Sequence, residues 1–195
     1  MLAGKRVLLG VTGGIAAYQA ADLIGLLQSR LADVRVIMTA AATRFITPLT
    51  LETISRHPVT VEMFHDGSAS RVEHISLAQG TDLIIVAPAT ANFLGKVANG
   101  IADDMLSTTV MASPAPAIIC PAMNEVMWQN SIVEQNVARL KEHGYRFVDP
   151  EYGAMACGGE GWGRLAKLST VLAAAIEVFR TDEKVSAHVV SDQLR

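Results

Sequence analysis

The chain has few cysteines and no long apolar run, and each shortage excludes a class of protein. Its two cysteines, Cys120 and Cys157, do not make a disulfide framework, and no Cys/His spacing indicates zinc. Half of the residues are apolar, yet no stretch approaches the ~18 apolar residues that a membrane span needs. The first apolar stretch runs straight into Gly13 and Gly14, without the cleavage pattern of a signal peptide. These features predict a cytoplasmic protein with no membrane contact and no metal site.

An excess of charge of one sign is also missing. Sixteen Lys and Arg residues against nineteen Asp and Glu residues give a net charge of −3, and both signs are mixed along the chain. Nucleic-acid-binding domains usually carry a basic face, so we expect no nucleic-acid partner. After Arg180 the sequence turns polar and charged. We therefore divide the chain into a domain of residues 1–180 and a polar C-terminal tail of residues 181–195.

Apolar runs of strand length alternate with segments of helical periodicity. Buried strands are predicted for Arg6–Val11 and for residues 34–38, 83–87, 117–120 and 145–148. Helices are predicted for residues 15–31, 99–111, 131–143 and 167–180. This alternation predicts an α/β fold, a three-layer doubly wound parallel sheet of the flavodoxin or Rossmann type. Such sheets bind ligands beyond the carboxyl ends of their strands, which here are followed by residues 12–16, 39–43, 88–92 and 121–124.

The segment VTGGIAAY follows the first predicted strand. Gly13 and Gly14 would let the backbone approach a ligand, and the next helix would present N–H groups to an anion. A tight turn explains the glycine pair as well, and the pattern is not GxGxxG. The missing third glycine argues against a dinucleotide site. Thr39 stands where an acidic ribose ligand would be expected, and its hydroxyl suits a phosphate or a flavin edge better.

The segments APATAN and PAMNEVMW follow the third and fourth predicted strands, which we expect to end at Pro88 and Pro121. In APATAN the small residues leave room for a flat ligand, while Thr90 also suits a helix N-cap. In PAMNEVMW the side chain of Asn124 offers a donor and an acceptor at the ligand edge. A turn asparagine that caps the next helix is the simpler interpretation of Asn124.

The segment GAMACGGEGWGR is rich in glycine, so we expect no regular element there and predict a mobile flap that closes over a substrate. Cysteines are usually small buried hydrophobic residues, which suits Cys120 at the end of a strand. Cys157 lies inside the glycine-rich segment instead, so we predict a chemical role for it. His74, in RVEHISL, is a weaker catalytic candidate, because a single histidine is usually structural or solvated.

Together these segments resemble the flavin-containing cysteine decarboxylases. The resemblance rests on VTGGIAAY, ITPLTLETIS, EHISL, APATAN, PAMNEVMW and ACGGEGWGR, and it covers residues 3–180. Within the family it points to the phosphopantothenoylcysteine decarboxylases, including the decarboxylase domain of the bacterial bifunctional coenzyme A enzyme. The resemblance implies FMN as the cofactor. It also implies a homo-oligomer, a trimer or a dodecamer built of trimers, with flavin and substrate at a subunit interface. Phe93 stands where some members carry a small or polar residue, so no contact is assigned to it.

The same resemblance assigns roles to individual residues. His74 corresponds to the catalytic histidine, a base or proton relay, and Cys157 to the late proton donor. Asn124 corresponds to the residue that holds the substrate carboxylate, and Met123 and Arg164 are assigned to substrate binding as well. The expected cofactor-binding residues are Gly13, Gly14, Ile15, Thr39, Thr90, Ala91, Asn92 and Ala122.

The reaction implied by the resemblance is FMN-dependent decarboxylation of 4'-phosphopantothenoylcysteine to 4'-phosphopantetheine in coenzyme A biosynthesis. Loss of CO₂ from an ordinary cysteine carboxylate would leave an unstabilised carbanion, so an electron sink is needed. Oxidation of the sulfur-bearing carbon to a thioaldehyde provides one, because the carboxylate then lies β to a C=S group. The enethiol left after CO₂ loss is reduced, so the overall reaction is redox-neutral and needs no nicotinamide.

Three other functions share part of this pattern. A peptide cysteine decarboxylase, which oxidises a C-terminal cysteine and stops at the enethiol, would share the flavin site, His74 and Asn124 but would not need Cys157. A prenyl-flavin transferase would share the fold and FMN without this set of three residues. A flavin-binding regulatory subunit would carry a vestigial site and act through its C-terminal tail. The chain stops before the ligase segment that follows this domain in many bacteria, so we expect no ligase activity from it.

Overall fold

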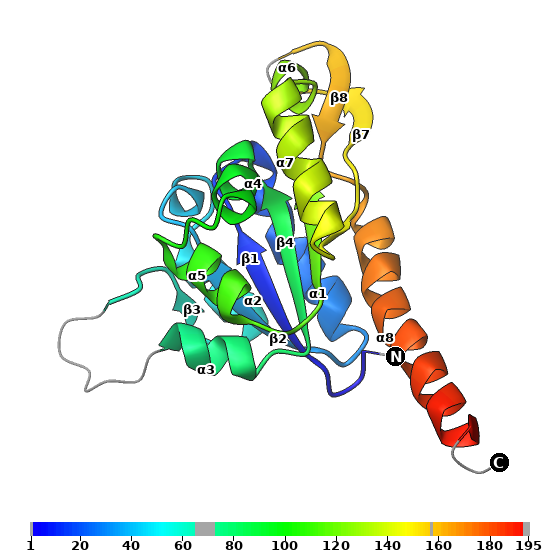
Figure 1. Cartoon of the computed structure of the whole chain (residues 1–195). Coiled ribbons are helices and arrows are strands. Elements are labelled where there is room, and N and C mark those ends of the chain that lie inside the picture. The colour runs from blue at the N-terminus through cyan, green and yellow to red at the C-terminus, as the bar shows by residue number, and fades with distance from the viewer. Residues whose placement is uncertain (1, 65–72, 157, 193–195) are drawn as a thin grey trace.

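The computed structural model describes residues 2–64, 73–156 and 158–192, and it has a central sheet between two layers of helices (Figure 1). Six parallel strands form this sheet in the order β3-β2-β1-β4-β5-β6. Their bounds are Arg6–Val11 (β1), Asp33–Met38 (β2), Val59–Thr60 (β3), Leu83–Ala89 (β4), Ala117–Pro121 (β5) and Arg146–Phe147 (β6). This is the strand order of the Rossmann fold, so the three-layer doubly wound α/β prediction is confirmed.

Alternate residues of each strand face opposite helical layers, as the two-residue period of a strand requires. On β1, Val7 and Leu9 face one layer and Leu8 faces the other. The first layer consists of α1 (Ala20–Gln28), α2 (Pro48–Ser55) and α8 (Leu168–Asp192), with the short turn η1 (Ile15–Gln19) before α1. The second consists of α3 (Glu73–Gln79), α4 (Ala91–Ala98), α5 (Met105–Ala112) and α7 (Ser131–Glu142). Both faces of the sheet are therefore buried, which explains why its strands are almost wholly apolar.

Of the two prolines predicted to end strands, Pro121 does so, whereas Pro88 lies inside a strand. β4 continues through Pro88 to Ala89, and the last residue of β5 is Pro121. The register between β4 and β5 shifts between Val86 and Ala89. Pro88 lies within this irregular stretch, where a residue without an N–H interrupts no regular ladder.

The helix predicted for residues 99–111 begins later than expected. Asn99 ends α4, and Gly100 follows with a φ of +73° that leaves the helical region. The next helix, α5, starts at Met105, where Asp104 accepts the N–H of Ser107 at 2.8 Å and caps it. The apolar periodicity alone could not locate this interruption, because residues on both sides of it are buried.

The glycine-rich segment forms a hairpin, so the prediction of no regular element was wrong. Strands β7 (Glu151–Ala154) and β8 (Glu160–Arg164) pair antiparallel, apart from the main sheet, and lie beside α6 (Glu125–Trp128) at the top of Figure 1. At Gly163, which has a φ of +120°, a Cβ would lie 2.0 Å from the carbonyl oxygen of Met123. Glycine here serves close backbone contact within a strand.

The boundary expected at Arg180 falls within α8, which continues as a helix to Asp192. The segment predicted as a tail is thus helical over residues 181–192. Over the part of the chain that the structure describes, no helix is both long and apolar enough to cross a membrane.

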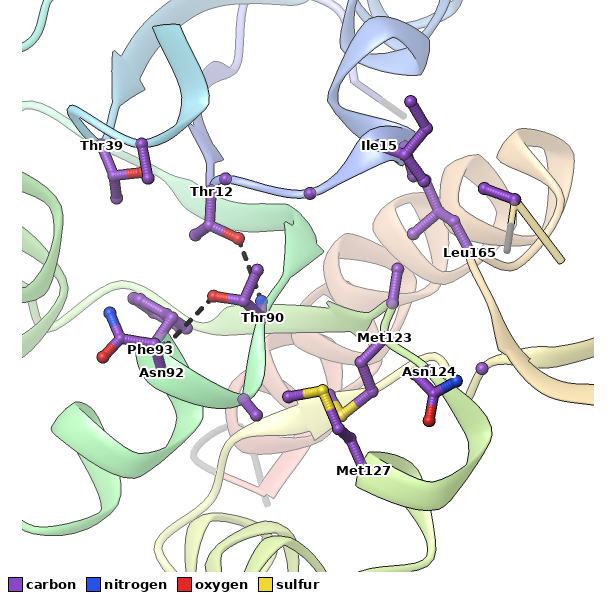
Figure 2. Close-up of a pocket in the computed structure, with 18 of the residues that line it drawn as sticks. Thr12, Ile15, Thr39, Thr90, Asn92, Phe93, Met123, Asn124, Met127 and Leu165 are labelled. Carbon is purple, nitrogen blue, oxygen red and sulfur yellow. Dashed lines mark hydrogen bonds between the residues drawn. The ribbon is translucent and has the colours of Figure 1, made fainter. Parts of the chain in front are cut away.

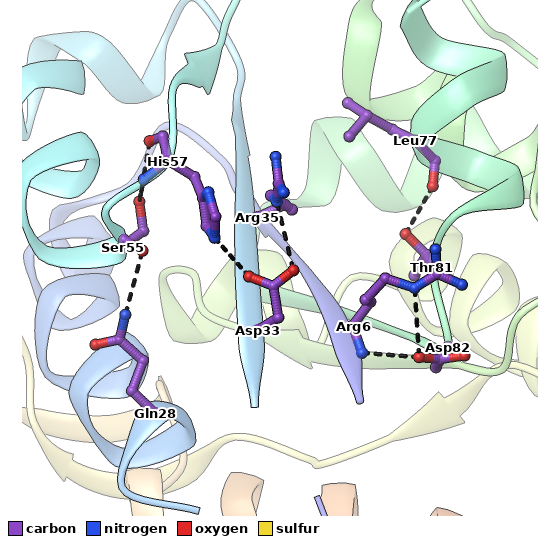
Figure 3. Close-up of polar contacts among 9 residues, drawn as sticks. All are labelled: Arg6, Gln28, Asp33, Arg35, Ser55, His57, Leu77, Thr81 and Asp82. Carbon is purple, nitrogen blue, oxygen red and sulfur yellow. Dashed lines mark hydrogen bonds and ion pairs between the residues drawn. The ribbon is translucent and has the colours of Figure 1, made fainter. Parts of the chain in front are cut away.

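Polar contacts join strands to neighbouring segments at the amino end of the sheet (Figure 3). The backbone N–H of Arg6 in β1 donates to Oδ2 of Asp82, just before β4, at 2.8 Å. Asp33 in β2 shares a hydrogen bond with His57 and pairs with Arg35 at 3.7 Å. These contacts hold the end of the sheet opposite to the loops that form the candidate site.

Candidate functional site

A cavity of ≈1080 Å³ opens at the carboxyl edge of the sheet. The loops that follow β1, β2, β4 and β5 line it together with the β7–β8 hairpin, and Figure 2 shows several of them around the same space. The strand order reverses between β1 and β4, and such switch points are where α/β sheets bind ligands. Ligand cavities usually measure about 300–1,000 Å³, and this one lies at the upper end of that range.

Most of the predicted site residues line this cavity. They are Gly13, Gly14, Ile15, Thr39, Thr90, Ala91, Asn92, Ala122, Met123, Asn124 and Arg164. His74 lies in α3 and is not among the described residues that line the cavity. Cys157 lies outside the residues that the structure describes, although Met155 and Ala156 line the cavity. The structure therefore brings the expected binding residues together, and the roles assigned to them stay predictions.

Thr12, which the sequence analysis did not single out, joins two of the loops. Its buried hydroxyl donates to the carbonyl oxygen of Pro88 at 2.7 Å. It also accepts the N–H of Thr90 at 3.0 Å, a bond that Figure 2 shows. The loop after β1 is thus bound to the loop after β4 by one side chain. The available signal was a hydroxyl residue that directly follows an apolar strand and precedes a glycine pair.

The glycine pair after β1 forms a tight turn, and the same two residues form part of the cavity wall. The N–H of Gly14 donates to the carbonyl oxygen of Thr12 at 3.0 Å, and both glycines line the cavity. A Cβ on Gly13 would lie 2.4 Å from the Cβ of Ala41. The loops after β1 and β2 are therefore in direct contact, and this contact requires glycine at position 13.

Thr90 and Asn124 cap helices and also line the cavity. The hydroxyl of Thr90 accepts the N–H of Phe93 at 3.4 Å at the start of α4. Oδ1 of Asn124 accepts the N–H of Val126 at 2.9 Å at the start of α6. This bond fixes the position of Oδ1, so it also fixes the direction of Nδ2, the donor atom of the amide. Helix capping and a place at the ligand edge are thus compatible at both positions.

An ion-pair cluster at the cavity wall was also missed from the sequence. Nζ of Lys96 lies 2.7 Å from Oδ1 of Asp103 and 2.8 Å from Oδ2 of Asp104, and Lys96 and Asp104 line the cavity. Hydrogen bonds to Asp103 and Asp104 raise the pKa of Lys96. Burial would raise the pKa of Asp104, but hydrogen bonds from Lys96 and Ser107 outweigh it and lower that pKa. Lys96 and Asp104 are therefore both charged at neutral pH.

Apolar and small side chains line much of the remaining wall. Met123 and Met127 project from the loop after β5 and from α6 (Figure 2). Phe93, to which no contact was assigned, is buried and lines the cavity too. The alanines on the wall are Ala16, Ala40, Ala41, Ala91, Ala122, Ala154 and Ala156. A cavity with an apolar lining and a few hydroxyl and amide groups suits a flat ring with polar edges.

Cys120 is a core residue, as its place at a strand end predicted. It is fully buried in β5. Burial raises the pKa of its thiol far above the ordinary value, so it stays protonated and unreactive.

Comparison with known proteins adds a family and several relatives. The family model described as Flavoprotein matches residues 1–180. The coenzyme A biosynthesis bifunctional protein CoaBC of Bacillus subtilis (strain 168) is 48% identical over 179 residues, 92% of this chain and 44% of that protein. CoaBC of Escherichia coli (strain K12) is 42% identical over 178 residues, 91% of this chain and 44% of that protein. The chain spans about half the length of the curated relatives it matches.

Solved structures share both the fold and part of the sequence. A PPC decarboxylase mutant complexed with pantothenoylaminoethenethiol matches with a TM-score of 0.80 and 29% identity, over 90% of this chain and 98% of that chain. The FMN-dependent cysteine decarboxylase SpaF matches with a TM-score of 0.78 and 34% identity, over 90% of this chain and 97% of that chain.

Proposed function

Because the chain belongs to the flavoprotein family, we propose that it binds FMN and converts 4'-phosphopantothenoylcysteine to 4'-phosphopantetheine in the cytoplasm, as a step of coenzyme A biosynthesis. One observation carries this proposal. The loops assigned to the cofactor and the PAMN and glycine-rich segments assigned to the substrate line a single cavity. The likeness to two coenzyme A biosynthesis proteins and to a PPC decarboxylase structure supports the same substrate.

The residues of the cavity fit FMN. Gly13 and Gly14 line the cavity, and the small alanine side chains beside them would leave room for a flat ring. Thr39, Thr90 and Asn92 would bind polar ring edges and the phosphate through hydroxyl and amide groups. Bound FMN would supply the two-electron redox chemistry that amino-acid side chains lack.

Asn124 would hold the substrate carboxylate. A neutral amide binds that group without stabilising the anion so strongly that CO₂ is retained. Its cap bond to Val126 fixes the amide before substrate arrives, so little ordering is left for the binding step. Met123 and Arg164 lie on the same cavity wall and would bind the rest of the molecule.

His74 would serve the site of a neighbouring subunit, as a base or proton relay. In Figure 1, α3 lies at the lower left beside β3, whereas α6 and the hairpin lie at the top. Large exposed apolar side chains support an interface between copies. Ile15 and Tyr18, which line the cavity, are 60% and 58% exposed, and Leu49 in α2 is 71% exposed. A trimer, alone or within a dodecamer, would bring α3 of one copy to the cavity of the next.

The first test of this function is the purified protein itself. We expect a yellow protein whose visible bands are those of oxidised flavin and which releases FMN on extraction. Incubation with 4'-phosphopantothenoylcysteine should give CO₂ and 4'-phosphopantetheine by mass spectrometry. A colourless protein that binds no flavin would contradict the proposal, and a wild-type product that stops at the enethiol would favour a peptide-type decarboxylase.

Cys157→Ser separates the two halves of the reaction. We expect this variant to release CO₂ and to accumulate the enethiol, because the proton that completes reduction is no longer delivered. The measurement is the ratio of enethiol to saturated thiol by mass spectrometry. Complete turnover to the saturated thiol would show that Cys157 is not the donor.

A further inference from the structure

Two consecutive residues of β8 bind the segment that carries Asn124. The carbonyl oxygen of Gly163 accepts the N–H of Met123 at 2.9 Å. The N–H of Trp162 donates to Oε1 of Glu125 at 3.0 Å. The backbone and one carboxylate thus attach the β7–β8 hairpin to the start of α6.

Glycine at two positions of β8 makes this attachment possible. A Cβ on Gly161 would lie 2.8 Å from Oε2 of Glu125, and one on Gly163 would lie 2.0 Å from the carbonyl oxygen of Met123. The carboxylate of Glu125 therefore occupies the space that a side chain at position 161 would fill. A Cβ at position 161 would meet the flexible end of a side chain, whereas a Cβ at position 163 would meet backbone.

Glu125 stands next to the cavity without being among the described residues that line it. Asn124 and Met127 on one side of the contact line the cavity, and so do Gly163 and Arg164 on the other. A carboxylate that accepts a backbone N–H makes a charge-assisted hydrogen bond, which is about twice as strong as a neutral one. The Glu125 contact therefore connects two walls of the site from outside it.

We propose that Glu125 is a positioning residue that holds β8 against the loop after β5 and so sets the distance between Asn124 and Arg164. The inference deepens the proposed function and rests on it for the identity of the substrate. Loss of the contact would let the hairpin shift relative to Asn124. Substrate binding, which uses both walls, would weaken.

The test compares Glu125→Ala with Glu125→Gln and Gly161→Ala in the FMN-loaded full chain. Glu134→Ala is a matched control, because Glu134 is an exposed acidic residue in the first turn of α7. Hydrogen–deuterium exchange measures the Trp162 amide, and steady-state kinetics measure KM and kcat for 4'-phosphopantothenoylcysteine.

We expect Glu125→Ala to speed Trp162 exchange by about fivefold or more, which is the effect of losing one hydrogen bond. KM should rise more than kcat falls, and Glu125→Gln should restore both partly because it keeps an acceptor. Gly161→Ala should resemble Glu125→Ala, since the added methyl displaces the carboxylate. The double variant should be no worse than either single one, because both break the same contact.

Unchanged Trp162 exchange in folded Glu125→Ala, or additive effects in the double variant, would overturn the proposal. The same rise in Trp162 exchange and in KM for Glu134→Ala would assign the effect to helix charge and would also overturn the proposal. The exchange result does not depend on catalysis. An inactive wild type would therefore refute the proposed function while the role of Glu125 is still decided.

Discussion

At the scale of the residue, glycine is required at position 13 because Ala41 packs directly against it. An alanine there would place its Cβ 2.4 Å from the Cβ of Ala41, so the loops after β1 and β2 would have to separate. We expect Gly13→Ala to cost about 1–3 kcal/mol of stability, as overpacking usually does. The widened wall should also weaken FMN binding by about tenfold, which corresponds to ~1.4 kcal/mol.

Gly25→Ala is the matched control for this substitution. Gly25 lies in the exposed face of α1, where an added Cβ would meet nothing within 4 Å. Alanine should stabilise the chain there by about 1 kcal/mol through helix propensity and leave the flavin affinity unchanged. Flavin fluorescence titration and urea unfolding measure both effects. Equal flavin affinities in the two variants would show that the Gly13 contact does not shape the cavity.

At the scale of the element, the Lys96 cluster joins α4 to the start of α5. We expect Asp104→Asn still to cap α5 by accepting the N–H of Ser107 but to lose the ion pair with Lys96. The free energy of unfolding should fall by about 1–2 kcal/mol. The cost should be greatest at neutral pH. The lowered pKa of Asp104 makes its contribution present above pH 3.8 and lost as the pH falls through the folded value.

At alkaline pH the ion pair is lost when Lys96 loses its proton. The raised pKa of Lys96 makes its contribution complete below pH 10.5 and lost as the pH rises through the folded value. The melting-temperature difference between wild type and Asp104→Asn should therefore form a plateau at intermediate pH and shrink at both ends. A difference that does not change with pH would assign the loss to packing rather than to the ion pair.

The sequence predicted elements best where a single periodicity runs uninterrupted. Buried strands such as β1 and the amphipathic α7 were located to within a residue or two, because their apolar pattern is a direct consequence of burial. The β7–β8 hairpin was missed because its glycines are explained only by a tertiary contact with Met123 and Glu125. Glycine content indicates either a loop or a close approach, and one chain without its fold does not separate the two.

The residues of the candidate site also fall into those that the sequence could predict and those that it could not. Loops after parallel strands converge by topology, so Gly13, Thr39, Thr90 and Asn124 could be grouped from the sequence. Residues that act by bonding other parts of the chain could not. Glu125, for example, makes its contact with Trp162, which is 37 positions away in the chain.

At the scale of the whole molecule, mixed oligomers test the proposal that the site is shared between subunits. His74→Asn and Asn124→Ala should each be inactive alone, because one removes the proposed proton relay and the other removes the proposed carboxylate contact. Refolded together at equal amounts, they should recover about a quarter of wild-type activity if each cyclic interface pairs copies at random. CO₂ release and light scattering measure activity and subunit number.

Two results would contradict this arrangement. Mixed oligomers without activity, formed from correctly folded chains, would place His74 outside the neighbouring site. Near-normal CO₂ release by His74→Asn alone would remove it from the reaction altogether.

The single hydroxyl of Thr12 has a consequence for attempts to redesign this protein. It belongs to the loop after β1 and bonds both a carbonyl and an amide at the end of β4, so neither segment can be redesigned for a new ligand without disturbing the other. Changes of substrate preference should therefore be sought on the opposite wall, at Met127 and along the hairpin. There side chains can be exchanged one at a time while the cofactor side stays intact.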